Sequence, residues 1–272
     1  MTILQQIVSE TRGRLAGKTD AAYRAELEKR AERHTPRGFR NRLNAARSGP
    51  AVIAELKKAS PSKGVIRSDF HVVELARAME QAGAAALSVL TEEKHFQGSL
   101  ENLRLASSKV SIPCLRKDFI VDELQMLEAR AFGADAALLI VAALDDSELK
   151  QLRRAAQILQ LDVLCEVHDE QELQRAIDVG FDIIGVNNRD LRTFQVTLET
   201  SLRLNRLIPA DALRVAESGI HTGADISRLR SAGYQAFLIG ESLMKERDPG
   251  TALSKLLADA AREERRAEVA SQ

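Results

Sequence analysis

AVIAELK, at residues 51–57, is the first of eight short apolar runs that return at intervals along the rest of the chain. A polar turn and a longer amphipathic stretch follow most of the runs before the next one begins. Short, nearly continuous apolar runs are typical of parallel strands whose two faces are both buried. The other seven runs are AALSVL (85–90), PCLRK (113–117), AALLIV (136–141), DVLCEV (162–167), IIGVN (183–187), RVAE (214–217) and AFLIG (236–240).

The longer stretches between the runs carry apolar residues at helical spacing. Eight strand–helix units predict an α/β fold of the (β/α)8 TIM-barrel class, because eight parallel strands close into a barrel. An open doubly wound sheet is the alternative, but the GxGxxG loop that usually follows its first strand is absent from the sequence. We predict helices at 72–82, 122–132, 146–159, 170–179 and 224–232, several of them ended by the left-handed caps Gly83, Gly133, Gly180 and Gly233.

The first part of the chain differs from the repeating part. Ile3, Leu4 and Ile7 recur at helical spacing, residues 21–34 are rich in helix formers, and Pro36 then interrupts the pattern. We therefore predict one domain over residues 1–272, in which residues 1–48 form an N-terminal helical extension of two helices and a short third one. A length of 272 residues is typical of one barrel.

Composition excludes several classes of function. The 39 Lys and Arg residues balance 39 Asp and Glu residues, so we expect no general attraction to nucleic acid or to an anionic membrane. Signal-peptide and membrane-span patterns are absent, which predicts a cytoplasmic protein. Cys114 and Cys165 lack the spacing of a metal site, and we expect neither a disulfide framework nor a metal site formed by them. His168 follows a strand and could be catalytic, but its position at the start of a helix suits capping equally well, so we do not include it in the predicted site.

Polar side chains are expected to converge on one rim of the barrel. Alternation along the first run places Val52, Ala54 and Leu56 toward the helices and Ile53 toward the barrel axis. The inward polar residues then stand at the carboxyl ends of the strands, where TIM barrels carry their active sites. Because burying charges without partners is costly, six such residues at similar heights predict a catalytic site. They are Glu55, Lys57, Lys117, Glu166, Asn187 and Glu217.

Two glycine-containing turns predict a phosphate site. Ser218-Gly219 follows the seventh run, and Gly240-Glu241 ends the eighth. TIM barrels often bind phosphate between these two loops through backbone N–H groups, which glycine allows to approach closely. The segment SPSKG (60–64), after the first run, is expected to be a flexible loop at the same rim.

Six strings in order resemble the indole-3-glycerol phosphate synthase family of tryptophan biosynthesis. That resemblance covers nearly the whole chain, and it implies that the N-terminal extension packs beside the barrel mouth. It implies a carboxy-lyase, EC 4.1.1.48, that converts 1-(2-carboxyphenylamino)-1-deoxy-D-ribulose 5-phosphate to indole-3-glycerol phosphate, carbon dioxide and water without a cofactor. The strings are VIAELKKASPSKG, LSVLTEEKHFQGS, LRKDFIVDELQ, GVNNRDLRTF, VAESGIHT and AFLIGESLM.

The same resemblance implies a role for each residue of the site. Lys117 is similar to the general acid that activates the substrate ketone, and Lys57 to the partner of the anthranilate carboxylate, with a further role in proton transfer left open. Glu166 is similar to the carboxylate that assists dehydration. Glu55, Asn187 and Glu217 are similar to residues that orient the lysines and the substrate. Ser60, Arg189, Ser218, Gly219, Gly240 and Glu241 fall where the family binds substrate, largely around the phosphate, and Phe96, Phe119 and Leu138 fall where it holds the aromatic ring.

Two positions depart from the family pattern, and several questions stay open. His95 stands where the family usually has an aromatic residue, and Asn188 where serine is common. Alternative functions are another phosphate-binding barrel enzyme, such as an isomerase or a Schiff-base aldolase, and a non-catalytic barrel scaffold. An isomerase needs a cysteine at the rim, whereas alternation turns Cys114 toward the helices. We expect a monomer that acts on a small phosphorylated molecule, and association with other enzymes of the tryptophan pathway is left open.

Overall fold

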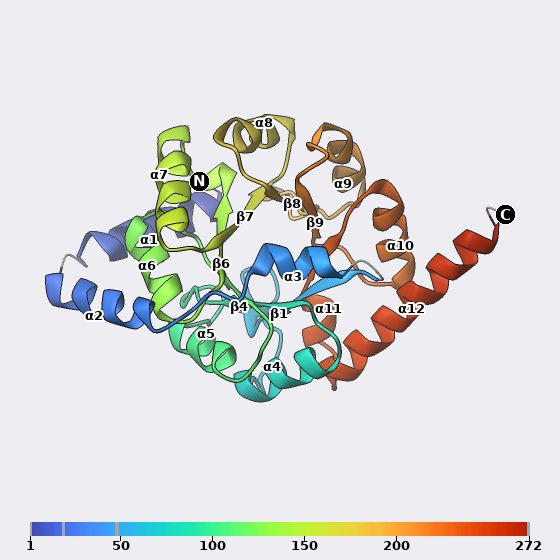
Figure 1. Cartoon of the computed structure of the whole chain (residues 1–272), viewed down its shortest axis with the longest axis horizontal. Coiled ribbons are helices and arrows are strands. Elements are labelled where there is room, and N and C mark those ends of the chain that lie inside the picture. The colour runs from blue at the N-terminus through green and yellow to red at the C-terminus, as the bar shows by residue number, and fades with distance from the viewer. Residues whose placement is uncertain (1, 18–19, 47–48, 271–272) are drawn as a thin grey trace.

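The eight apolar runs form the eight strands of a closed parallel barrel in the computed structural model of the chain (Figure 1). The structure describes residues 2–17, 20–46 and 49–270. Consecutive barrel strands pair in parallel, and the last strand pairs with the first, so the predicted (β/α)8 TIM barrel is confirmed. The strands are β1 (Ala51–Leu56), β4 (Ala86–Leu90), β5 (Cys114–Lys117), β6 (Ala136–Ile140), β7 (Asp162–Val167), β8 (Ile183–Asn187), β9 (Leu213–Glu217) and β10 (Ala236–Ile239).

Helices surround the barrel on its outside (Figure 1). Their bounds agree with the five predicted stretches to within one residue, and the four predicted glycine caps all have positive φ angles. Throughout the described part of the chain, every helix is too short or too polar to cross a lipid bilayer. The outer helices are α4 (Val72–Gln81), α5 (Leu100–Ser107), α6 (Glu123–Ala131), α7 (Asp146–Ile158), α8 (Glu170–Val179), α9 (Glu199–Leu204), α10 (Gly223–Ala232), α11 (Glu241–Met244) and α12 (Pro249–Ala270), with short 3-10 turns at Val141–Ala143 and Asn205–Leu207.

The alternation predicted for the strands is confirmed by the two large clusters of buried side chains. Val52, Ala54 and Leu56 pack in the cluster between the barrel and the helices, where Cys114 and Cys165 also lie. Ile53 packs in the cluster inside the barrel, which also includes Leu115, Leu138 and Leu164. The two faces of each strand are thus buried, and the polar residues of the inner face are left at the carboxyl ends of the strands.

The segment at 60–64 differs from the expected flexible loop. Its two ends pair as a small antiparallel hairpin, β2 (Ala59–Ser60) with β3 (Gly64–Val65). The loop prediction is wrong at these ends, because backbone hydrogen bonding to Ala59 and Ser60 holds the segment over the rim of the barrel. Only the tip of the hairpin, residues 61–63, is a turn.

Three helices precede the barrel, and they contact it at different places. α1 (Ile3–Ala16) lies at the carboxyl ends of the strands, where Ile3, Leu4 and Ile7 line the cavity described below. α2 (Ala21–Glu32) packs against α6. α3 (Phe39–Ala45) covers the opposite end of the barrel, where Phe39 packs among residues of the strand starts. Residues 1, 18–19 and 47–48 of this extension lie outside the described residues.

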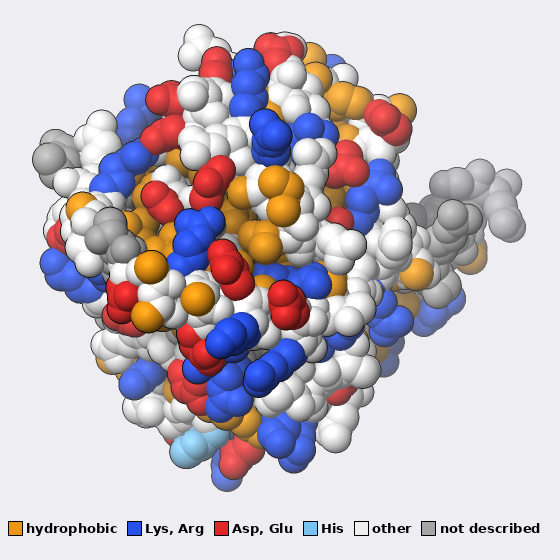
Figure 2. All heavy atoms as spheres, turned by 60° about the vertical axis from the view of Figure 1, so that its left-hand side comes forward, with side chains coloured by type: hydrophobic (Ala, Val, Ile, Leu, Met, Phe, Trp, Pro, Cys, Tyr) orange, Lys and Arg blue, Asp and Glu red, His pale blue; other side chains and the backbone are white. Residues whose placement is uncertain are grey.

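Figure 2 shows Lys and Arg side chains intermixed with Asp and Glu side chains over the face where the N-terminal helices lie. Many of these charges are paired within one helix or between neighbouring helices, as in the ion pair between Arg12 of α1 and Glu148 of α7. A surface of mixed sign produces no strong field toward a polyanion. The arrangement agrees with the formal net charge of zero.

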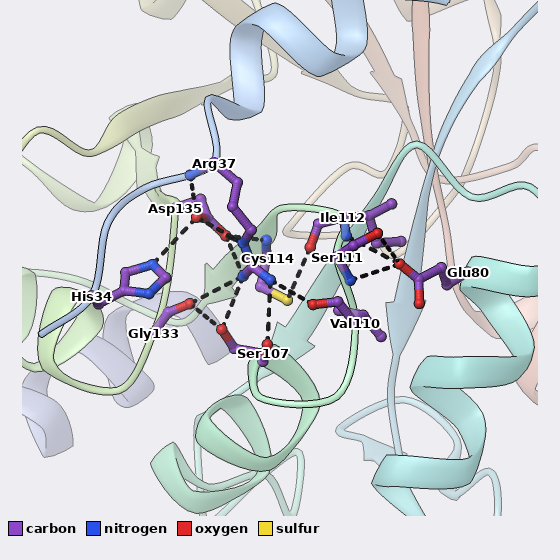
Figure 3. Close-up of polar contacts among 10 residues, drawn as sticks. All are labelled: His34, Arg37, Glu80, Ser107, Val110, Ser111, Ile112, Cys114, Gly133 and Asp135. Carbon is purple, nitrogen blue, oxygen red and sulfur yellow. Dashed lines mark hydrogen bonds and ion pairs between the residues drawn. The ribbon is translucent and has the colours of Figure 1, made fainter.

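A buried carboxylate fastens the chain between α2 and α3 to the starts of two barrel strands (Figure 3). Asp135, whose side chain is fully buried, accepts hydrogen bonds from the backbone N–H of Arg37 at 2.7 Å and from its guanidinium at 2.6 Å. It also accepts one from the backbone N–H of Cys114, at 2.6 Å. Burial alone would raise the pKa of Asp135, but its hydrogen bonds with His34 and Arg37 hold that pKa below its usual range. The extension is therefore attached to the barrel by a charged group that needs its partners.

Asp135→Asn should lower the free energy of unfolding by about 3 kcal/mol, because it leaves Arg37 without its buried counter-ion. We expect the low end of the range for buried pairs, since Arg37 keeps some contact with water. The midpoint of urea unfolding measures this change. Glu101→Gln breaks a solvent-exposed ion pair with Arg104 and serves as the control, with an expected loss below about 1 kcal/mol. An equal effect of the two substitutions would contradict the importance given to Asp135.

Candidate active site

A cavity of about 430 Å³ opens at the carboxyl ends of the barrel strands. It is lined by residues from nearly every strand end, by the tip of the β2–β3 hairpin, by α1 and by the loop after β8. The fifteen residues singled out from the sequence all lie on its wall, so the structure brings the whole predicted set together. These are Glu55, Lys57, Ser60, Phe96, Lys117, Phe119, Leu138, Glu166, Asn187, Arg189, Glu217, Ser218, Gly219, Gly240 and Glu241.

Lys117 stands between the side chains of Glu166 and Glu217. We call these three residues and Asn187 the cavity floor. Its Nζ donates to Glu166 on β7 at 2.7 Å and to Glu217 on β9 at 3.4 Å. Asn187 on β8 donates from its side-chain amide to the other oxygen of Glu166, at 3.0 Å. All four side chains are largely buried, with Glu166 and Glu217 only 2% exposed. Four strands thus place a cation, two carboxylates and an amide within hydrogen-bonding reach.

A second lysine–carboxylate pair comes from β1 and the residue that follows it. Lys57 Nζ lies 2.5 Å from Glu55 Oε1. Two glycines make room for the buried carboxylates, since a Cβ at Gly240 would collide with Glu55 and a Cβ at Gly185 with Glu217. Gly240 therefore makes room for Glu55 and also forms the turn after β10. The backbone at these two positions must approach the carboxylates closely, which only glycine allows.

The central carboxylates have unequal affinities for protons. Burial raises the pKa of Glu217 to about 8, and the neighbouring Glu166 adds to the rise. Burial acts in the same direction on Glu166, but Lys117 and His168 more than offset it and hold the pKa of Glu166 well below its usual range. Burial would lower the pKa of Lys117, yet Glu166 and Glu217 outweigh that effect and raise it above its usual value. Near neutral pH the site therefore holds a charged lysine, an ionised carboxylate and a protonated carboxyl side by side.

His168 belongs to this network, and the structure decides between the two roles that the sequence left open. The helix α8 is capped by Asp169, whose side chain accepts from the backbone N–H of Glu172, and not by His168. The imidazole of His168 lies 3.3 Å from Glu166 and 2.9 Å from Glu172. A signal was present in the sequence, since His168 has the same parity as the inward residues Leu164 and Glu166 of its run.

One side of the cavity is an apolar slot. The rings of Phe96 and Phe119 lie with their centroids 6.0 Å apart, and Leu138 continues the surface. α1 also lines the cavity with aliphatic side chains, in agreement with the place beside the barrel mouth that the family resemblance implies for the N-terminal extension. Helical spacing alone does not show which surface a helix covers. Glu92, itself buried, holds the loop that carries Phe96 by accepting from the backbone N–H groups of residues 94, 95 and 96 at 2.7–3.0 Å.

The opposite side of the cavity has the turns expected to bind phosphate. Ser218 and Gly219 both have left-handed backbones, with φ angles of 65° and 75°, and a Cβ at Gly219 would collide with Val196 of the loop after β8. Arg189 lies 3.7 Å from Glu241, whose carboxylate also pairs with Lys245. A carboxylate repels a phosphate, so Glu241 suits this place through its backbone rather than through its side chain.

The two positions that depart from the family pattern have structural contacts of their own. His95 pairs with Glu10 of α1 at 2.8 Å and so connects the loop of the apolar slot to the helix that covers it. Asn188 is buried, donates to the backbone carbonyl of Ser218 at 3.1 Å and accepts from the backbone and hydroxyl of Ser201. Asn188 therefore supports the turn expected to bind phosphate.

Solved structures that resemble this fold belong to unlike proteins. KGPDC from Streptococcus mutans superposes with a TM-score of 0.60 at 12% identity, over 79% of this chain and 98% of that one. A mandelate oxidase variant superposes with a TM-score of 0.59 at 18% identity, over 79% and 72% of the two chains. At such low identity the likeness shows the TIM-barrel fold alone.

Sequence comparison is more specific. The family model described as indole-3-glycerol phosphate synthase matches residues 4–256. An indole-3-glycerol phosphate synthase from Koribacter versatilis is 62% identical over 255 residues, which cover 93% of this chain and 98% of the relative. A protein of the same name from Polaromonas naphthalenivorans is 48% identical over 263 residues, covering 94% and 99% of the two chains. The chain therefore belongs to the indole-3-glycerol phosphate synthase family.

Proposed function

We propose that the cavity performs the reaction of this family, and that its buried groups divide the work as described below. The reaction joins the ring carbon that bears the carboxylate to the ketone carbon of 1-(2-carboxyphenylamino)-1-deoxy-D-ribulose 5-phosphate, and then releases carbon dioxide and water to give indole-3-glycerol phosphate. The observation that carries the proposal is the position of Lys117. It stands between Glu166 and Glu217, with an apolar slot on one side and the glycine turns on the other.

Lys117 is assigned the activation of the ketone. Forming the ring bond turns the ketone oxygen into a hydroxyl, so a positive hydrogen-bond donor at that oxygen stabilises the transition state. The ionised Glu166 is the main group that keeps Lys117 charged, since it raises the pKa of Lys117 above the usual value. A substrate carbonyl that enters the cavity meets this ammonium group at the bottom, away from bulk water, where the interaction is strong.

Loss of water from the cyclised intermediate needs a proton donor and a proton acceptor close to each other. Glu166 is ionised and suits the acceptor, which removes a proton from the intermediate as the hydroxyl leaves. Glu217, with a pKa raised to about 8, still holds a proton near neutral pH and can donate it to the departing hydroxyl, which then leaves as water. Asn187 keeps Glu166 in place through the hydrogen bond of its amide.

Lys57 is assigned the carboxylate of the anthranilate ring. Its ammonium group is held at the cavity wall by Glu55, next to the apolar slot that suits the ring. The carboxylate is negatively charged in the substrate and departs as neutral carbon dioxide. Its contact with the Lys57 ammonium group therefore exists in the substrate and ends with decarboxylation. The phosphate is assigned to the turns at Ser218–Gly219 and Gly240–Glu241, with Arg189 and Ser60 at their edge.

The alternatives fit the geometry less well. A Schiff-base aldolase needs a neutral lysine amine, whereas the ionised Glu166 keeps Lys117 charged. An isomerase that depends on a rim cysteine is not supported, because Cys114 is buried against the helices and burial raises the pKa of its thiol to about 12. A non-catalytic scaffold would not need two carboxyl groups with unequal pKa values around a buried lysine. We also propose that the chain works without a cofactor, because the side chains assigned above supply the proton transfers of the reaction, and that it is a cytoplasmic monomer, as expected from the sequence.

Lys117→Ala should lower kcat by at least about 100-fold, because the charged donor to the ketone oxygen is lost. Turnover of the carboxyphenylamino-deoxyribulose phosphate, followed by indole fluorescence, measures the change, and circular dichroism checks the fold. Lys150→Ala, on the exposed face of α7, is the control and should turn over normally. Turnover of Lys117→Ala near the level of the unmodified chain would refute the assignment.

Inorganic phosphate or sulfate should inhibit competitively and should occupy the turns at Gly219 and Gly240 in a crystal. Gly219→Ala should weaken this inhibition, since the left-handed φ and the contact with Val196 both oppose a side chain there. The inhibition constants of the two proteins give the comparison. An empty pocket in a sulfate-soaked crystal, together with no competitive inhibition, would place the phosphate elsewhere.

Lys57→Met keeps the aliphatic stem and removes the charge, so it should weaken substrate binding more than product binding. A hydrogen bond to a charged group is worth about 1.5–3 kcal/mol, which is about ten- to a hundredfold in affinity. The chain has no Trp, so the indole of the product can be followed by its own fluorescence. Substrate affinity follows from single-turnover titration. If both affinities fall equally, Lys57 holds the phosphate that substrate and product share, and the role given to it here is wrong.

A further inference from the structure

His168 lies behind the cavity floor rather than on it. It follows β7 directly, its side chain is 11% exposed, and it is not among the residues that line the cavity. Its Nε2 is 3.3 Å from Oε1 of Glu166, and its Nδ1 is 2.9 Å from Oε2 of Glu172 on α8. Glu172 is fixed in turn, because the same oxygen accepts from the backbone N–H of His168 at 2.8 Å.

Both ring nitrogens of His168 therefore face carboxylate oxygens. A neutral imidazole carries one N–H, and its other nitrogen is an acceptor. That acceptor would lie against the lone pairs of a carboxylate in either tautomer, with no water between them at these distances. The doubly protonated imidazolium avoids this repulsion, because Nδ1–H donates to Glu172 and the protonated Nε2 forms an ion pair with Glu166, although without hydrogen-bond geometry.

We propose that His168 is a permanent cation and a positioning residue, which holds Glu166 ionised and turned toward Lys117. The proposal rests on the role given above to Glu166 as proton acceptor. Oε2 of Glu166 faces Lys117, while Oε1 lies between Asn187 and His168. The Glu166 carboxylate thus has partners at both of its oxygens, and its protonation would weaken its contacts with the cations Lys117 and His168.

The charges around this group account for the direction of the effect. Lys117 faces Glu166 from β5 and the carboxyl of Glu217 approaches from β9, while Glu172 faces His168 from α8. The charge of Glu55 on β1 also raises the pKa of Lys117, although no hydrogen bond or ion pair joins the two side chains. Burial would lower the pKa of His168, but Glu166 and Glu172 more than offset it and raise the pKa to about 10. His168 consequently keeps its charge at neutral pH.

Nuclear magnetic resonance of the uniformly ¹⁵N-labelled chain tests the charge without any substrate. The His168 ring, assigned by its loss in His168→Gln, should show two protonated nitrogens at pH 8 and should titrate near pH 10. In Glu172→Gln, which leaves the cavity wall untouched, its pKa should fall toward the ordinary value of about 6.5. Titration of His168 near pH 6.5 in the unmodified chain would overturn the proposal, whatever reaction the chain catalyses.

The pH profile of kcat tests the consequence for catalysis. Removing the cation in His168→Gln should raise the pKa of Glu166, so the acid limb of the profile should move to higher pH by about 1–3 units. kcat should fall more than KM rises, since His168 does not touch the cavity. His71→Gln, at an exposed position, is the matched control and should leave the profile unchanged. An acid limb that stays in place in a folded His168→Gln would overturn the proposal, whereas an unmodified chain without turnover would count against the proposed function instead.

Discussion

The ion pair between Lys117 and Glu166, with Glu217 beside it, is the interaction on which the rest of the site depends. A buried charge is tolerated only when partners replace the water that it loses. Each neighbour supplies such a partner, from the amide of Asn187 to the imidazole of His168. The space comes from Gly185, where a side chain would displace Glu217. Removing one member therefore alters the protonation of the others, and stability and chemistry are coupled at this floor.

The barrel strands and the residues of the cavity floor can be predicted from the sequence, because both predictions rest on the alternation of side chains between the two faces of a strand. Ile53 and Glu55 share one face of β1, so the same pattern that buries the core also selects the polar residues of the mouth. α5 and α9 have eight and six residues, too few for helical periodicity to identify them securely. The structure reveals what spacing does not carry, namely which surface α1 covers and how β2 pairs with β3.

The position of His168 in the sequence does not decide its role. Its parity is inward, but the start of a helix is equally suited to a capping residue. Only the position of Glu172, one helical turn later, reveals that the ring is held between two carboxylates. The same holds for His95 and Asn188, since each contacts a residue outside its own sequence neighbourhood. His95 pairs with Glu10, and Asn188 accepts from Ser201. Contacts of this kind depend on tertiary packing, which a single sequence does not encode locally.

The central claim is that this floor closes an indole ring, and turnover of 1-(2-carboxyphenylamino)-1-deoxy-D-ribulose 5-phosphate by the purified chain tests it most directly. Indole fluorescence and release of ¹⁴C-labelled carbon dioxide from the labelled carboxyl group follow the two products together. We expect one carbon dioxide to appear for each indole-3-glycerol phosphate, without added metal or cofactor. A folded chain that leaves the substrate unchanged, or that releases carbon dioxide without forming indole, would contradict it.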